Sequence, residues 1–256
     1  MTYCIGMQIN KGLVFMADTR TNAGVDNVST FKKIFSWEYK GEIFVTILAS
    51  GNLATTQFLV NLLNDIFNEK NKDKSEAFFH NASLFDIAKK VGKELKSIIS
   101  QNVEIGLKGD TSFHANLILG GQVKGEIPKM FLIYPQGNFI ESSSDNPFFQ
   151  IGETKYGKPI LVRAYDPSLS FEETIKLMLL SFDSTLKANL SVGLPLDFQI
   201  YEKDEFITGA HGRFQNGDQY FADVSSGWSL ALKSAFKAMP NLNMEKNKSK
   251  VYWNKQ

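Results

Sequence analysis

MTYCIGMQINKGLVFMAD, residues 1–18, is the stretch around which the rest of the chain can be ordered. Two short apolar runs flank the turn sequence Asn10-Lys11-Gly12, and this pattern predicts a β-hairpin. Alternation along the first strand puts Thr2 on the same face as the small residue Cys4, which leaves room for a substrate. The second strand runs back toward the beginning of the first, so its end at Asp18 is expected near Thr2.

Thr2 directly follows the initiator methionine and is a candidate nucleophile. Removal of Met1 would leave a threonine whose hydroxyl attacks while its own neutral α-amine accepts the proton. The unperturbed pKa of an α-amine is about 7.7–8.0, and a nearby lysine ammonium lowers it by like-charge repulsion. Asp18 and Lys33 are the candidate carboxylate and cation. Lys32 is the alternative cation, although strand alternation points the two lysines to opposite faces.

The remaining chain reads as blocks of strands and helices in a single domain. A polar loop is expected over residues 19–30 and a charged connector over residues 69–74. Further strands are expected at residues 31–37, 42–50, 112–121, 129–134, 138–140, 148–152 and 196–201. Helices are expected after Asn52, from Ser83, from Ser170 and around Trp228, with capping-box pairs at the second and third. This order predicts an α+β fold in which helices stack outside sheets.

Composition excludes several classes of function. The chain has 256 residues, of which 43% are hydrophobic and 21% charged, and its net charge is +1. This balance gives no electrostatic footprint for nucleic acid or an anionic membrane, so neither is expected as a partner. No uninterrupted apolar run approaches about 18 residues, and a cytoplasmic protein is expected. The single cysteine excludes an internal disulfide, and the three scattered histidines predict no metal site; no cofactor is expected either.

Several segments resemble a known family over essentially the whole chain. The order of several short segments resembles that in proteasome β-type subunits. These segments are Met1-Thr2, the strand–turn–strand, ADTR (17–20), Lys33-Ile34 and ASG (49–51). Other motifs more specifically resemble Anbu, the bacterial ancestral β-subunit. They are TNAGVD (21–26), SGNLATTQ (50–57), IGETKYGKP (151–159) and the Trp228 segment. The resemblance implies a four-layer α-β-β-α sandwich of the N-terminal-nucleophile (Ntn) hydrolase type. It implies one domain, residues 1–256, with a C-terminal helical extension from about residue 220.

The resemblance also implies a role for each residue that matches the family pattern. Thr2 is the expected nucleophile, and Lys33 is the expected ammonium that depresses the pKa of the amine. Asp18 is expected to orient Lys33, and Arg20 to buttress the acidic residue. The N–H of Gly51 is expected in the oxyanion hole, where one donor contributes about 3–4 kcal/mol to the transition state.

The second half of the chain departs from the proteasome pattern. Glu153 stands after Gly152, where proteasome subunits carry a serine. Asn189 and Ser191 are the best counterparts of an aspartate and a serine that support the terminal amine. A neutral Asn189 favours the free base and orients it less firmly, which predicts weak or substrate-restricted peptidase activity.

Three functional hypotheses follow from these residues. The first is a threonine peptidase that cleaves amide bonds of a peptide or protein through a Thr2 acyl-enzyme. The second is a self-assembling scaffold or binding protein with little peptidase activity, and the third is an Ntn amidase or transferase on a small peptide-like substrate. The resemblance implies a homo-oligomer, either a ring or an open helical stack. No ATP-binding motif is present, so any unfolding ATPase would be a separate protein.

Overall fold

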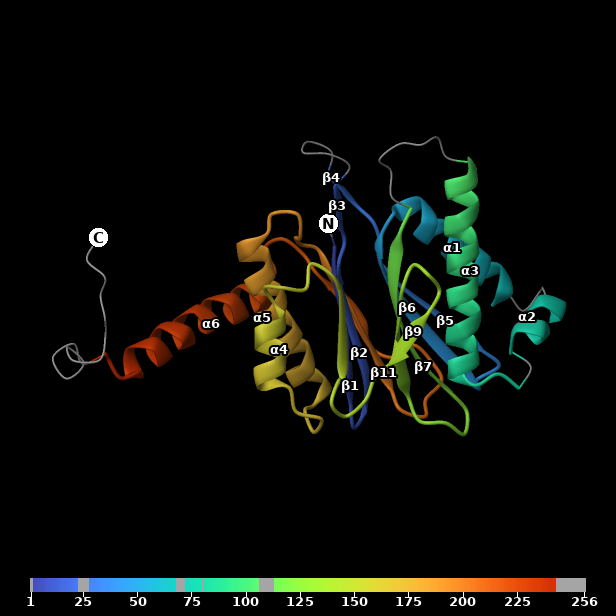
Figure 1. Cartoon of the computed structure of the whole chain (residues 1–256). Helices are drawn as coiled ribbons and strands as arrows, with labels where there is room; N and C mark the ends of the chain where they lie inside the picture. Colours follow the sequence, from blue (N-terminus) through green and yellow to red (C-terminus); the bar gives the residue numbers. More distant parts are fainter. Residues whose placement is uncertain (1, 23–27, 68–71, 80, 106–112, 243–256) are drawn as a thin grey trace, which may run out of the picture.

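Two five-stranded antiparallel sheets pack face to face at the centre of the molecule (Figure 1). The computed structural model describes residues 2–22, 28–67, 72–79, 81–105 and 113–242. The first sheet has the order β10-β1-β2-β11-β12. Its strands, in chain order, are β1 (Tyr3–Ile9), β2 (Gly12–Asp18), β10 (Phe148–Gly152), β11 (Leu196–Glu202) and β12 (His211–Phe214).

The second sheet has the strand order β5-β6-β7-β8-β9, so each strand pairs with its chain neighbour. Its strands are β5 (Ile34–Tyr39), β6 (Ile43–Gly51), β7 (Ala115–Val123), β8 (Lys129–Ile133) and β9 (Phe139–Glu141). A separate two-stranded ribbon joins the two sheets and consists of β3 (Arg20–Asn22) and β4 (Val28–Thr30).

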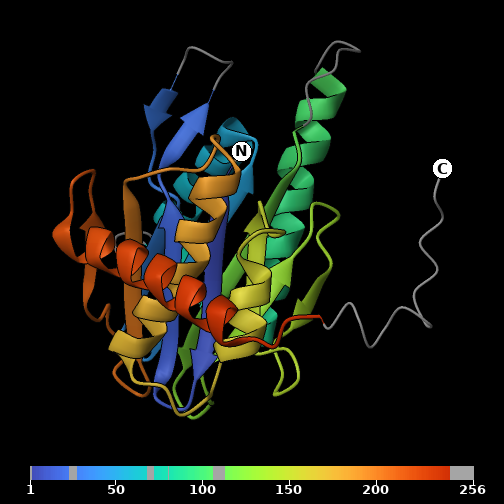
Figure 2. The same ribbon diagram turned by 90° about the vertical axis from the view of Figure 1, so that its left-hand side faces the viewer.

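Helices cover both outer faces of this sandwich (Figures 1 and 2). The second sheet is covered by α1 (Leu53–Ile66), α2 (Lys72–Phe79) and α3 (Leu84–Ile105). The first sheet is covered by α4 (Lys158–Ala164) and α5 (Phe171–Ala188), and α6 (Gln219–Ala238) crosses α5. The α+β four-layer sandwich predicted from the sequence is confirmed. No helix in the described part of the chain is both long and apolar enough to cross a membrane.

Strand β1 divides its side chains between two cores, as its alternation predicts. Tyr3, Ile5 and Met7 pack in the cluster beneath α4 and α5. Cys4 packs instead in the cluster between the two sheets. Thr2, which has the same parity as Cys4, therefore belongs to the side of the sheet that faces the inter-sheet space.

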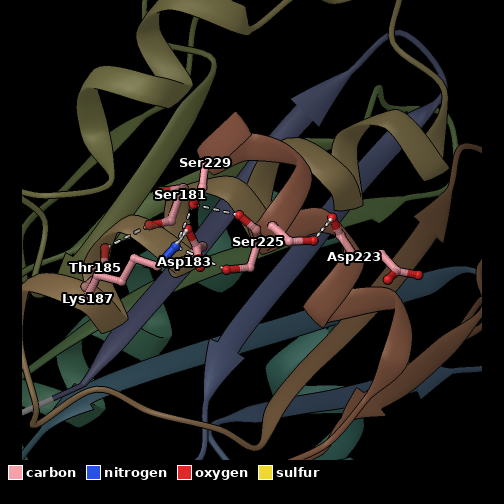
Figure 3. A network of polar contacts seen from close by, with 8 residues as sticks. Ser181, Asp183, Thr185, Lys187, Asp223, Ser225 and Ser229 are labelled. Atoms are coloured by element: carbon pink, nitrogen blue, oxygen red, sulfur yellow. Dashed lines mark hydrogen bonds and ion pairs between the residues drawn. The ribbon is translucent and has the colours of Figure 1, made fainter. Parts of the chain in front are cut away.

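A polar network holds α6 against α5 (Figure 3). Lys187 of α5 lies 2.8 Å from Asp183 and donates hydrogen bonds to Ser225 at 3.1 Å and Ser229 at 3.4 Å on α6. None of the residues of α6 is buried in the single chain, and the helix projects away from the body of the molecule. The Asp183–Lys187 pair thus anchors only the first half of the C-terminal extension.

The predicted helix starts at Asn52 and Ser170 are confirmed, and some local predictions are wrong. Asn52 accepts a hydrogen bond from Thr55, and Ser170 forms a complete capping box with Glu173. The polar loop predicted over residues 19–30 contains the paired strands β3 and β4, in which Arg20 is opposite Thr30. Its polar side chains gave no apolar alternation by which to recognise strands.

Four further elements, α2, β5, α4 and β12, also differ from the prediction. Residues 69–71 of the predicted charged connector 69–74 lie outside the described residues, and from Lys72 the chain is helix α2. Phe79 of this helix packs on Tyr39 with ring centroids 4.6 Å apart. The strand predicted over residues 31–37 is displaced to Ile34–Tyr39. Helix α4 and strand β12 were not predicted, since each is short and without a clear hydrophobic period.

Candidate active site

A buried ion pair lies at the end of the sandwich where β1 begins. Asp18 ends β2, and Lys33 stands just before β5; Nζ of Lys33 lies 2.8 Å from Oδ1 of Asp18. The backbone N–H of Tyr3 also donates to Oδ1 of Asp18, at 2.9 Å. The carboxylate therefore lies directly against the peptide bond that joins Thr2 to Tyr3. Lys32, by contrast, is exposed, with its Nζ 6.0 Å from the centre of the Phe35 ring.

Burial dominates the electrostatics of Asp18. Its side chain is fully buried, and desolvation raises the pKa of the carboxyl above its ordinary value, while the Lys33 ammonium acts against that rise. Lys33 also donates to the backbone carbonyl of Arg20 at 2.6 Å. Oδ2 of Asp18 is buried and has no hydrogen-bond partner among the described residues. The charge of Asp18 thus depends chiefly on Lys33.

The backbone of Thr2 is fixed by the end of β10. Tyr3 pairs with Gly152, and the N–H of Glu153 donates to the carbonyl of Thr2 at 2.7 Å. Gly152 has φ +83°, and a Cβ on it would lie 1.9 Å from the Thr2 carbonyl oxygen. Only glycine permits this close approach. The sequence motif contained Gly152, but its contact with Thr2 depends on long-range pairing that sequence reasoning missed.

Gly51 lies at the same end of the sandwich, at the junction of β6 and α1. Cys4 Sγ donates to the carbonyl of Ala49 at 3.7 Å, and the N–H of Ala49 donates to the carbonyl of Lys33 at 3.2 Å. Gly51 follows two residues after this contact, with φ +113°, and is exposed. A Cβ there would lie 2.3 Å from the carbonyl oxygen of His114, so the position requires glycine. The turn presents its backbone at the surface beside the Asp18–Lys33 pair.

Arg20 supports the site in a different way from the one the resemblance implies. Its guanidinium donates to the carbonyl of Leu190 at 3.0 Å and packs on Gly193, where a Cβ would lie 2.4 Å from Cζ. Within the described residues no ion pair joins Arg20 to Asp18. Arg20 therefore ties the ribbon to the loop after α5, and its carbonyl, not its charge, holds Lys33.

The three residues that depart from the proteasome pattern lie together. Nδ2 of Asn189 donates to Oε2 of Glu153 at 2.9 Å, and the N–H of Ser191 donates to Oδ1 of Asn189 at 2.9 Å. Because Glu153 also binds the carbonyl of Thr2, a continuous chain of hydrogen bonds connects Thr2 to the end of α5. The structure thus gathers all eight candidate residues at one end of the sandwich.

Tyr3 is a supporting residue that sequence reasoning missed. Its hydroxyl lies 2.7 Å from Oγ of Ser181 and accepts a hydrogen bond from Gln150. Its side chain is completely buried and packs on Phe182 with ring centroids 4.5 Å apart. These contacts hold the residue next to Thr2. No local signal marks them, since the partners are about 150 to 180 residues away in sequence.

The four layers and this arrangement at the start of β1 define a subunit of the proteasome type. The model of the proteasome subunit family matches residues 2–194. A mutant Anbu (Gly-1) from Hyphomicrobium sp. strain MC1 is 44% identical, with TM-score 0.85, over 95% of this chain and 100% of that chain. Anbu from Yersinia bercovieri is 41% identical, with TM-score 0.84 and the same coverage.

A third similar structure is the helical assembly of the Anbu complex from Pseudomonas aeruginosa, at 36% identity and TM-score 0.83 over 95% of this chain and 99% of that chain. No match was found among curated proteins. The chain belongs to the proteasome subunit family, in its Anbu (ancestral β-subunit) branch.

Proposed function

We propose that the protein is an N-terminal threonine hydrolase, which cleaves amide bonds of peptides or proteins after loss of Met1. The observation that carries this proposal is the buried Asp18–Lys33 pair, whose carboxylate accepts a hydrogen bond from the peptide group that follows Thr2. A permanently positioned ammonium at this place favours the neutral form of a nearby α-amine. The free amine is the base that such a nucleophile requires.

The proposed reaction proceeds through an acyl-enzyme. The amine of Thr2 takes the proton of the Thr2 hydroxyl, directly or through a water, as the oxygen bonds to the substrate carbonyl carbon. The resulting oxyanion is bound by the N–H of Gly51. Breakdown of the intermediate expels the amine product, which takes the proton. Water then attacks the ester, with the same amine as base, and regenerates the Thr2 hydroxyl.

Hydrolysis of fluorogenic peptides by the purified protein tests this function. Replacement of Thr2 by alanine keeps the backbone contacts with Glu153 and removes the attacking oxygen, so turnover should fall to background. The assembly state, measured by light scattering, should not change. Equal hydrolysis by both proteins would exclude Thr2 as the nucleophile.

A scaffold with little peptidase activity is the second candidate function. It is favoured by the Asn189–Glu153 hydrogen bond, because the family's charged and hydroxylic supports of the amine are replaced here by this pair. Intact mass distinguishes the two functions: the scaffold requires no free Thr2 amine, and the hydrolase requires that Met1 be absent.

We further propose that the protein forms a homo-oligomer in the cytoplasm. The similar structure from Pseudomonas aeruginosa is a helical assembly, and α6 exposes large apolar side chains, such as Phe236 at 81% and Leu230 at 68%. Apolar surface of this kind on a projecting helix favours contact with another subunit.

A further inference from the structure

A pocket of about 450 Å³ opens between the edges of the two sheets, beside the proposed active site. It lies between β5 on one side and the β11–β12 hairpin on the other. Its lining includes apolar, polar and charged residues: Ile34, Ser36, Gln199, Lys32, Asp197 and Arg213. Phe198 also lines it, but the side chain of Phe198 packs mainly with the cluster on the other face of its sheet. The mechanism proposed above uses none of these side chains.

The pocket shares the inter-sheet face with Thr2. Lys32 directly precedes Lys33, and Leu196 pairs with Asp18 across the sheet. In the next register row, Asp197 pairs with Ala17, and Ala17 pairs with Cys4. Neighbouring strands lie about 4.8 Å apart, so Asp197 is about 10 Å from Cys4, which stands two residues along the chain from Thr2. Ala17 and Cys4 themselves are fully buried between the sheets.

The charges that line the pocket do not balance. Arg213 binds Asp197 through two hydrogen bonds, at 2.6 Å from Nε and 2.9 Å from Nη2, so these two charges compensate each other. Lys32 has no ion pair or hydrogen bond to a described residue, and its Nζ lies 6.0 Å from the centre of the Phe35 ring. His211 hydrogen-bonds through Nδ1 to its own loop at Gly209 and adds no negative charge. The pocket therefore presents one uncompensated cation above a lining that mixes Ile34 with the hydrogen-bonded pair Ser36–Gln199, which favours an anion with a short stem.

The free edge of β5 indicates how such an anion would be delivered. β5 is the terminal strand of its sheet, so the backbone groups on its outer side have no strand partner among the described residues. An extended peptide recognises such an edge through main-chain hydrogen bonds and places alternate side chains into pockets. Lys32 and Ile34 stand at the beginning of this edge, next to Lys33.

We propose that this edge pocket is a subsite for an acidic side chain of the peptide substrate, with Lys32 as the residue that recognises its carboxylate. This proposal rests on the hydrolase function above and deepens it by naming the substrate class as acidic peptides. The Asp197–Arg213 pair shapes the pocket, and Lys32 supplies the net charge.

Binding to the Thr2→Ala protein tests the proposal without any turnover. The probes are two capped tetrapeptides, acetyl-Ala-Ala-Glu-Ala-amide and its glutamine counterpart, titrated by NMR at low salt. The glutamate peptide should bind about tenfold more tightly, because a hydrogen bond to a charged group is lost with glutamine. The added variant Lys32→Gln should abolish this preference, Lys32→Arg should keep it, and the exposed control Lys176→Gln on α5 should leave it unchanged.

Equal binding of the two peptides, or a preference that survives Lys32→Gln, would overturn the proposal. Succinate that binds as tightly as the glutamate peptide would overturn the assignment to a peptide in favour of a free small acid. The outcome does not depend on the proposed hydrolysis, since the nucleophile is absent. Failure of catalysis appears separately, as turnover by wild-type protein that does not exceed background.

Discussion

Asp18 is the buried acid of the proposed site, and burial raises the pKa of its carboxyl. Its carboxylate is fully buried, one of its oxygens has no partner among the described residues, and Lys33 is the one described residue that forms an ion pair with it. A buried ion pair contributes little when intact, but loss of one partner leaves an uncompensated charge. The two residues should therefore behave as one unit, in stability as well as in catalysis.

Replacing Asp18 by asparagine should separate these effects. The amide keeps the size of the side chain and leaves the Lys33 ammonium buried without its counter-ion, so the free energy of unfolding should fall by about 3 kcal/mol. Hydrolysis should fall at least a hundredfold. Urea unfolding and steady-state kinetics measure both, with the exposed Asp145→Asn as the control. A variant with wild-type activity would show that Asp18 does not orient Lys33.

Tyr201 provides a pH dependence whose sign can be worked out. Its hydroxyl donates to Gln122 at 2.6 Å, and burial raises the pKa of Tyr201 to about 12. The unfolded chain ionises this phenol near pH 10 and the folded chain only near pH 12. The contribution of Tyr201 to stability is therefore complete below pH 10 and is lost as the pH rises toward 12.

The urea midpoint should accordingly fall between pH 10 and pH 12, and it should fall less in Tyr201→Phe. The difference between the two proteins isolates this residue from the other tyrosines and lysines. Parallel decreases in both proteins would contradict the account of Tyr201.

At the scale of elements, the pairing of β1 with β10 positions the nucleophile. Gly152 pairs with Tyr3, and the N–H of Glu153 donates to the carbonyl of Thr2, so the end of β10 holds the beginning of β1 in place. A side chain at Gly152 would push directly on Thr2. The same backbone conformation occurs at Gly217, with φ +85° against +83°, but nothing lies within 4 Å of a Cβ there.

This matched pair gives a prediction at the element scale. Gly217→Ala should lose about 1 kcal/mol from the unfavourable φ, and Gly152→Ala should lose more, because its Cβ also meets the Thr2 carbonyl. Only Gly152→Ala should also lose activity, by about a hundredfold, because it displaces Thr2. Thermal melts and peptide hydrolysis provide the two measurements. Similar activity of the two variants would show that β10 does not position Thr2.

Long elements with a regular hydrophobic period could be predicted from the sequence. Elements that form only by pairing with a distant strand could be predicted less well. The capping box at Ser170 and the hairpin of β1 and β2 carry their information locally, and both were predicted. Strand β12 exists because it pairs with β11, with Leu196 opposite Phe214, and this information is not local.

The candidate site shows the same limit. Thr2, Asp18 and Lys33 were selected from the hairpin pattern and a family resemblance. The contact of Asp18 with Lys33 depends on the ribbon β3–β4, which brings the chain back to the end of β2. The hydrogen bond from Asn189 to Glu153 joins positions 36 residues apart and could not be read from either residue alone. The role of Arg20 also depended on where the loop after α5 folds back.

On the scale of the whole molecule, α6 is the feature that a single chain does not explain. Its second half has no buried residue, and Phe236 is 81% exposed. A helix with an apolar surface of this size gains stability by packing on another subunit.

Phe236→Glu should therefore weaken self-association. Multi-angle light scattering should find smaller species at equal concentration, while circular dichroism retains the helical signal. Lys237→Glu is the control, because it changes the charge at the neighbouring exposed position of the same helix. An unchanged size distribution in Phe236→Glu would exclude this part of α6 from the interface.

The central claim is that Thr2, once Met1 is removed, is a nucleophile activated by the Asp18–Lys33 pair. Its most direct test is the mass of the purified protein before and after treatment with a β-lactone, which acylates nucleophilic threonines. The account predicts a chain lacking Met1 that gains one acyl group on Thr2, and much slower acylation in Lys33→Met. A chain that retains Met1, or an acyl group on any other residue, would contradict it.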